Sequence, residues 1–258
     1  MKYSKILKYE FLNIARNRWV FFYTLLMAGL SFSILKISGD AHKTSVTLSS
    51  VIVVLGPLVA SVFTALYWYY NERFTELMLS QPLRRTSLLW MRWVALSLAL
   101  SAGFVLGTLL PFVFLWQWVD SLLLVIAVGV FLMITFVGVS ILFCTCSIDR
   151  MKGVGLCLGL WLYLSMVHDS IVLLTLIALK DYPMDFPAGL LGVLNPLGLA
   201  RVCLLMTQDA ALLLGHTGII VRNILTGGAG FSIAAGLALL WMLLPMILAH
   251  RAWRHRDF

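Results

Sequence analysis

Six long apolar segments constrain what this chain can fold into more than any other feature of its sequence. They span residues 19–37, 46–69, 88–116, 122–146, 154–179 and 228–250. A transmembrane α-helix needs about 20 mostly apolar residues to cross the roughly 30 Å hydrocarbon core of a bilayer. Prolines occur within these segments, among them Pro57 and Pro245, and membrane helices tolerate them where neighbouring helices satisfy the freed backbone groups. The sequence therefore predicts an all-α membrane protein with six transmembrane helices.

The composition excludes a soluble globular protein. Hydrophobic residues make up 61% of the 258 residues and charged residues only 12%, with a mean hydropathy of +0.97. A soluble domain is about 45–50% apolar and about 25% charged, so this chain has too little polar surface to cover a water-soluble globule. Intrinsic disorder is also excluded, because disordered chains have low hydrophobicity and many charged residues. We therefore expect one transmembrane domain over residues 1–258, embedded in a lipid bilayer.

The net charge of +8 indicates an anionic membrane surface as the partner rather than a nucleic acid. An even number of spans places both termini on the same side, and the positive-inside rule identifies that side as the cytoplasm. Only five of the 19 basic residues then lie on the outer side, namely Lys36, Lys43, Lys180, Arg201 and Arg222. We expect a multi-pass protein with both termini in the cytoplasm.

Two segments outside the spans carry apolar patterns. Residues 1–18 carry one helical stripe, formed by Tyr3, Leu7, Phe11 and Ile14. This stripe favours an interfacial amphipathic helix over an ordinary cationic flank of the first span. The longest connection, residues 180–227, lies on the outer side, and its apolar patches are interrupted by Asn195-Pro196 and by glycines. It predicts short helices on the outer face before the last span.

The connection between the second and third spans, residues 70–87, is the most informative segment. Glu72 and Glu76 are four residues apart and so share one face of a helix. The other side of that helix is apolar, with Phe74, Leu77 and Met78. Pro82 ends the helix. A solvated loop has little reason to gather these apolar residues, so we expect a short amphipathic helix that docks to a cytoplasmic protein. Its candidate docking residues are Glu72, Arg73, Phe74, Glu76, Leu77, Arg84 and Arg85.

An ionisable pair, His168-Asp169, lies close to the middle of the fifth span. Ionisable side chains at that depth cost about 2.5–3.5 kcal/mol or more and are functional-site hypotheses by default. Trp161, Ser165 and His168 share one helix face, and Asp169 lies about 100° around the helix from them. The sequence leaves two interpretations open. These four residues line a translocation path between helices, or the pair is buried and fixes helix packing.

Metal-binding and enzyme motifs are weak in this sequence. Cys144 and Cys146 point about 200° apart on a helix, so they cannot both bind one ion. We expect no metal site on the chain. A P-loop is absent from the sequence, which excludes ATP hydrolysis by that mechanism. Ser140 and His168 lack the G-x-S-x-G context of a serine hydrolase. The chain is therefore expected to be no enzyme, with no catalytic residue and no cofactor of its own.

Several short motifs occur in order along most of the chain. They are Tyr69-Tyr70-Asn71, Phe74-Thr75-Glu76-Leu77, Gln81-Pro82-Leu83-Arg84-Arg85-Thr86-Ser87, Leu160-Trp161-Leu162, His168-Asp169, Asp181-Tyr182-Pro183, Leu194-Asn195-Pro196 and Leu214-Gly215-His216-Thr217-Gly218. Together with the six spans and the amphipathic N-terminus, this ordered set resembles the ABC type-2 transporter permeases. Within them it is similar to the NosY-type permeases of nitrous oxide reductase maturation.

The resemblance implies a permease subunit that pairs with a second copy of itself as a homodimer. It implies two copies of a separate, NosF-like cytoplasmic ATPase, which would hold the ATP and Mg²⁺, and a NosD-like periplasmic protein on the outer face. The membrane would be a bacterial inner membrane, and the cargo a copper- or sulfur-related species for the copper centres of nitrous oxide reductase. Residues 72–83 match the family's coupling helix, so the resemblance gives the docking residues an ATPase-coupling role.

A rival interpretation is a self-sufficient secondary transporter or channel that uses His168-Asp169 as an ion or proton relay. Such a protein would move solute without any nucleotide, whereas a permease subunit depends on its ATPase.

Overall fold

The described part of the chain is built from helices. The computed structural model describes residues 2–79, 85–178, 194–207 and 228–254, and these ranges contain no strand. Six helical segments are long and apolar enough to cross a membrane. This confirms the predicted all-α, multi-pass membrane protein.

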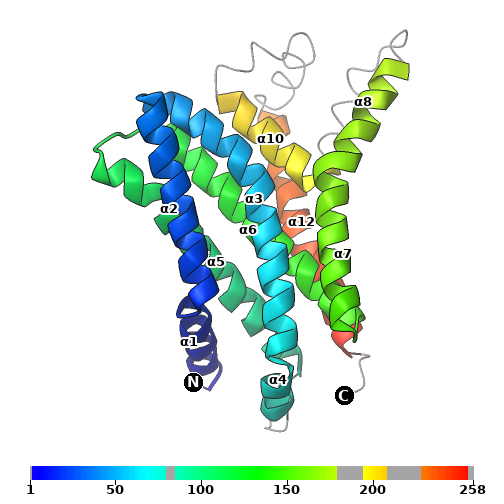
Figure 1. Ribbon diagram of the computed structural model, residues 1–258. Helices are drawn as coiled ribbons and strands as arrows, with labels where there is room; N and C mark the ends of the chain where they lie inside the picture. The colour runs from blue at the N-terminus through cyan, green and yellow to red at the C-terminus, as the bar shows by residue number, and fades with distance from the viewer. Residues whose placement is uncertain (1, 80–84, 179–193, 208–227, 255–258) are drawn as a thin grey trace.

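The helices keep one order along the chain, and their bounds differ slightly from the predicted spans. They are α1 (Lys2–Ala15), α2 (Arg18–Ser38), α3 (Ala41–Tyr70), α4 (Glu72–Leu79), α5 (Arg85–Phe114), α6 (Ser121–Cys146), α7 (Arg150–Leu162), the π-helix η1 (Tyr163–Val167), α8 (His168–Ala178), α10 (Pro196–Thr207) and α12 (Gly228–Arg254). Helices α7, η1 and α8 follow without a break and form the fifth span. Helices α1 and α4 lie at the same end of the bundle as the last turn of α12 (Figure 1).

Side-chain caps explain where several helices begin. Asn17, Asp40 and Asp149 each precede a helix and accept a hydrogen bond from the backbone N–H two residues later. Such caps satisfy backbone donors that have no partner in the first turn. Helix α3 therefore starts at Ala41, before the predicted residue 46, and includes a polar first turn. The connection from α2 shrinks to Gly39 and Asp40, with Gly39 in the left-handed conformation at φ 62°.

Helix α6 is the centre of the bundle and packs against α3, α5, α7, α10 and α12. Helix α5 also packs closely on α2, because Gly103 and Gly107 face that helix. A Cβ atom on Gly107 would come within 2.7 Å of the carbonyl oxygen of Thr24. Pairs of small residues four apart allow this close approach of membrane helices.

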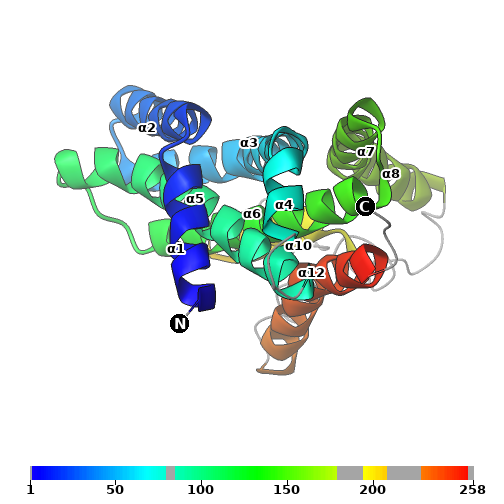
Figure 2. The same ribbon diagram turned by 90° about the horizontal axis from the view of Figure 1, so that it is seen from below.

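The view from the end with α1 and α4 shows how these two short helices are placed. Helix α1 extends across the end of the bundle and packs mainly against α5 (Figure 2). Helix α4 continues beyond the end of α3 (Figure 1). Within the predicted outer segment, α10 is the helix described, and it packs against α6 and α3.

Candidate functional site

Asn71 connects the end of α3 to the start of α4. Its backbone N–H donates to the carbonyl oxygen of Tyr67 at 3.1 Å, and its side-chain Nδ2 donates to the same oxygen at 2.9 Å. Its own carbonyl oxygen accepts from the backbone N–H of Thr75 at 3.0 Å. One residue therefore ends α3 and begins α4, so the predicted amphipathic helix follows the span with no loose connection.

Helix α4 presents a mixed surface. Leu77 is 67% exposed and Arg73 is exposed, whereas Phe74 is half-buried. Glu72 is the first residue of α4 and is also half-buried. Arg85 is exposed at the first position of α5. The side chain of Glu76 and the whole of Arg84 lie outside the described residues.

A buried polar network ties α4 to three other helices. Arg92 of α5 donates from Nη1 to the Thr75 Oγ1 atom at 2.8 Å. Its Nη2 atom lies 3.6 Å from Oε1 of Glu10, which is on α1. Tyr67 of α3 donates its hydroxyl proton to Oε2 of Glu10 at 2.9 Å. The Thr75 hydroxyl in turn donates a hydrogen bond to the carbonyl oxygen of Asn71 at 2.7 Å.

The network is deeply buried. Glu10 is 1% exposed, Arg92 2% and Thr75 4%. The guanidinium carbon of Arg92 also lies 5.3 Å from the ring centre of Trp68, within cation–π range. Removing one member of a buried pair leaves an uncompensated charge and typically costs about 3–5 kcal/mol. The network therefore connects the four helices at this end of the bundle.

Sequence reasoning missed Glu10 and Arg92 as site residues. Two signals point to them in retrospect. Glu10 lies on the apolar stripe of α1, between Leu7 and Ile14, where a carboxylate needs a partner. Arg92 lies inside the predicted span 88–116, where a charge is costly unless it is paired.

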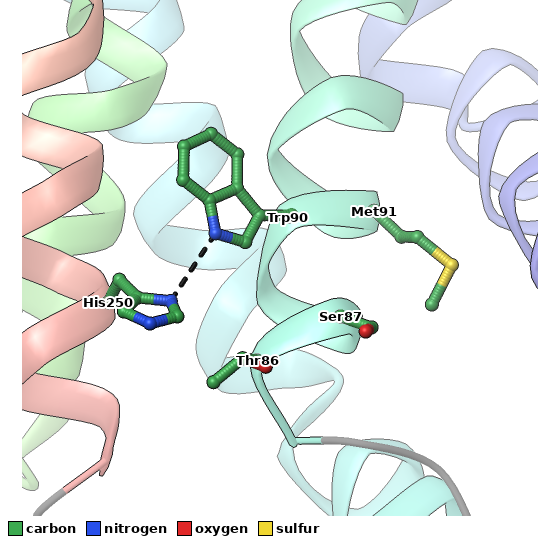
Figure 3. A pocket seen from close by; sticks show the side chains of 5 residues that line it. All are labelled: Thr86, Ser87, Trp90, Met91 and His250. Atoms are coloured by element: carbon green, nitrogen blue, oxygen red, sulfur yellow. Dashed lines mark hydrogen bonds between the residues drawn. The ribbon is translucent and has the colours of Figure 1, made fainter.

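The start of α5 is also attached to the end of α12. The indole Nε1 of Trp253 donates to the carbonyl oxygen of Arg85 at 3.2 Å, and its ring packs edge-on against Trp68. Trp90 donates from Nε1 to Nδ1 of His250 at 3.3 Å (Figure 3). Because Nδ1 is the acceptor here, the ring proton of neutral His250 sits on Nε2. Thr86, Ser87, Trp90, Met91 and His250 line a cavity of about 430 Å³ at this junction (Figure 3).

A second polar cluster joins α8 to α10 and contains the predicted pair His168-Asp169. Asp169 forms an ion pair and hydrogen bond with Arg201 of α10. The Nδ1 atom of His168 lies 3.2 Å from the amide nitrogen of Asn195. Arg201 is therefore the counter-ion of Asp169. From the sequence alone, Arg201 belongs to the outer connection and has no assigned partner. The side chains of Asp169 and Arg201 are 37% and 36% exposed.

The π-helix η1 supplies backbone acceptors to this cluster. The backbone N–H of His168 bonds to the carbonyl oxygen of Tyr163, five residues earlier, instead of four. Two carbonyl oxygens of the π-helical turn accept side-chain donors from the neighbouring segment. The Leu164 oxygen accepts from Asn195 at 2.7 Å, and the Ser165 oxygen accepts from Arg201 at 3.5 Å. The irregular turn and α10 thus complete each other's hydrogen bonds.

Trp161 and Ser165 do not extend this cluster through their side chains. The indole Nε1 of Trp161 donates to the carbonyl oxygen of Val54 on α3 at 3.1 Å. The Ser165 hydroxyl donates to the carbonyl oxygen of Leu162 in its own helix at 3.4 Å.

The cysteines do not gather into a larger donor set. Cys144 is buried and Cys146 is exposed, so they point to different environments. Cys157 of α7 is also buried, and its thiol donates to the carbonyl oxygen of Ser140 at 4.0 Å. Over residues 2–79, 85–178, 194–207 and 228–254, no three His, Cys, Asp or Glu side chains form a group that could hold a metal ion.

Compared with known proteins, the chain matches no family model and no curated protein.

Proposed function

We propose that this chain is the transmembrane permease subunit of an ATP-driven ABC transporter. A separate cytoplasmic ATPase would bind ATP and Mg²⁺ and dock on α4, so the chain itself would perform no hydrolysis. The observation that carries the proposal is the buried contact from Thr75 of α4 to Arg92 of α5 and Glu10 of α1. A docking helix with an exposed outer side and a buried polar anchor is suited to pass motion from a partner to the spans.

The network supports this role through its incomplete hydrogen bonding. Within the described residues, Nε and Nη2 of Arg92 and Oε1 of Glu10 have no hydrogen-bond partner. Unsatisfied buried polar atoms raise the free energy of this arrangement, which would make a second arrangement of the network easier to reach. Helix α4 would therefore shift between two docked positions when the ATPase binds and releases ATP.

The proposal includes a homodimer, supported by the surface of α7. Gly155 and Gly159 are four residues apart and exposed, and a Cβ atom on either would meet no other atom within 4 Å. The pair has the same spacing as Gly103 and Gly107, which bring α5 against α2. A membrane helix from a second copy fits such a face. The transport pathway would then run between the two copies.

Through its resemblance to NosY-type permeases, the proposal extends to the partners and cargo. The protein would lie in a bacterial inner membrane with both termini cytoplasmic, between a NosF-like ATPase and a NosD-like periplasmic protein. The cargo would be a copper- or sulfur-related species for the copper centres of nitrous oxide reductase. Uptake into vesicles that contain the full complex, scored separately for copper and for sulfur, distinguishes the two cargoes.

The direct test is charge reversal on α4. The variant Glu72→Lys/Glu76→Lys should reduce both co-purification of the ATPase and the ATPase rate of the reconstituted complex. Asp120→Lys is the matched control, because Asp120 precedes α6 and its side chain makes no capping hydrogen bond. Assembly and turnover that stay unchanged in the double variant would remove α4 from the mechanism.

The alternative function, a self-sufficient transporter with His168-Asp169 as a relay, has one observation in its favour. These ionisable side chains and Arg201 are partly exposed rather than sealed in the core. Transport by the purified chain in vesicles without nucleotide would establish this alternative. The permease proposal expects no transport under those conditions.

A further inference from the structure

A cavity of about 650 Å³ lies between α2 and α3, beside the buried network. The two helices separate toward the end of the bundle where α1 lies (Figure 1). The polar residues of its lining gather at that end, with Asn17 and Arg18 at the start of α2 and Tyr70 and Asn71 at the end of α3. Farther in, the lining is mostly apolar, with Tyr23 and Tyr67 among its residues, and it ends at Leu26 and Leu58. The cavity is therefore amphiphilic along its length.

The length of the cavity matches one leaflet of a bilayer. On α2 the lining runs from Arg18 to Leu26, and on α3 from Leu58 to Asn71. At 1.5 Å per helical residue these stretches rise about 12 Å and about 20 Å. Half of a hydrocarbon core is about 15 Å thick. An acyl chain entering from the end with α1 would reach about the middle of the membrane.

The mouth of the cavity is positively charged. Arg18 is exposed there, and the guanidinium group of Arg150 lies 4.3 Å from the ring centre of Tyr70. No Asp or Glu is among the described residues that line the cavity. A basic mouth above an apolar channel complements an anionic head group joined to a hydrocarbon chain.

We propose that this cavity binds one anionic phospholipid from the leaflet on the side of the termini. The phosphate group sits at Arg18, Arg150 adds a second positive charge beyond Tyr70, and one acyl chain fills the channel down to Leu26 and Leu58. The lipid then contacts Tyr67 and Asn71, which line the cavity and also belong to the buried network. A bound lipid would hold the joint between α3 and α4 in place.

The test measures lipid retained by the full chain after purification. The protein is equilibrated with phosphatidylglycerol or phosphatidylcholine of the same acyl chains, and the bound lipid is counted by native mass spectrometry. We expect one phosphatidylglycerol per chain, retained in preference to phosphatidylcholine. Arg18→Gln should lower its affinity about fivefold, as expected for one basic residue at a membrane surface. Arg16→Gln removes the same charge two residues away, outside the lining, and should retain the lipid.

A second pair of variants tests the apolar channel without changing charge. Leu58→Trp fills the channel and should abolish the retained lipid, whereas Leu98→Trp, on an exposed part of α5, should not. Equal loss in Arg16→Gln and Arg18→Gln, or equal binding of both lipids, would overturn the proposal in favour of unspecific annular lipid. It would also be overturned if two copies of the Trp19→Cys variant formed a disulfide with each other at this position, since the second copy would then occupy the cavity.

Discussion

The Oε1 atom of Glu10 and the Nη2 atom of Arg92 lie 3.6 Å apart, and both side chains are almost completely buried. The first belongs to the short helix across the end of the bundle, and the second to the third span. Their contact is therefore an electrostatic connection between α1 and the membrane-spanning helices.

Breaking this pair from one side should cost more stability than removing it completely. Arg92→Met leaves the buried Glu10 charge without a partner and is expected to lower the free energy of unfolding by about 3–5 kcal/mol. The double variant Glu10→Gln/Arg92→Met removes both charges and should recover part of that loss. Thermal unfolding followed by tryptophan fluorescence measures the difference, with Arg16→Gln as an exposed-charge control. A double variant as unstable as the sum of both single variants contradicts a mutual contact.

Thr75 should matter for coupling because it is the only described residue of α4 that is fully buried. Thr75→Val keeps the shape of the side chain but removes the oxygen that accepts from Arg92. We expect a loss of about 1–3 kcal/mol in stability and, if the chain is the proposed permease, a smaller effect on the ATPase rate of its proposed partner. Thr47→Val is the matched control, since that exposed hydroxyl bonds only to the Lys43 carbonyl of its own helix. Equal behaviour of both variants would place the coupling elsewhere.

Variants of the ion pair between Asp169 and Arg201 distinguish a role in helix packing from a role as a proton or ion relay. If the pair fastens α10 to α8, exchanging the charges in Asp169→Arg/Arg201→Asp should restore most of the stability that either single change removes. Transport by the reconstituted complex should return along with it. A proton or ion relay requires the carboxylate at its own position, so an exchanged pair that is stable but inactive would favour the relay.

The glycine face of α7 provides a test of the dimer. Gly155→Leu/Gly159→Leu adds bulk where no other described atom lies, so the single chain should keep its stability while the proposed dimers dissociate. The population of dimers is read by cross-linking in the membrane and by native mass spectrometry. Gly236→Leu on α12 has similarly open surroundings and serves as the control. A double variant that remains dimeric places the interface on another face.

The helices of this chain can be predicted from its sequence better than the contacts between them. The apolar segments predict the membrane helices because length and hydrophobicity are local properties. Helix starts shift where a single cap such as Asp40 extends the helix beyond its apolar part. The pattern of residues 70–87 also predicts α4, because amphipathic spacing is local too.

The polar partners could not be assigned in the same way. Glu10 and Arg92 are distant in sequence, and only the packing of α1 on α5 brings them together. Asp169 was a candidate because of its depth, but its partner Arg201 comes from a helix within the predicted outer segment. The π-helical turn adds a further effect, since it changes the spacing on which the shared face of Trp161, Ser165 and His168 depended.

The joint at Asn71 has a mechanical consequence. Because this residue closes one helix and opens the next, α4 behaves as a short lever with its fulcrum at the end of α3. The tether from Thr75 to Arg92 sits one turn along that lever. We therefore expect a force applied at the exposed side of α4 to reach α5 through Arg92 and then α1 through Glu10.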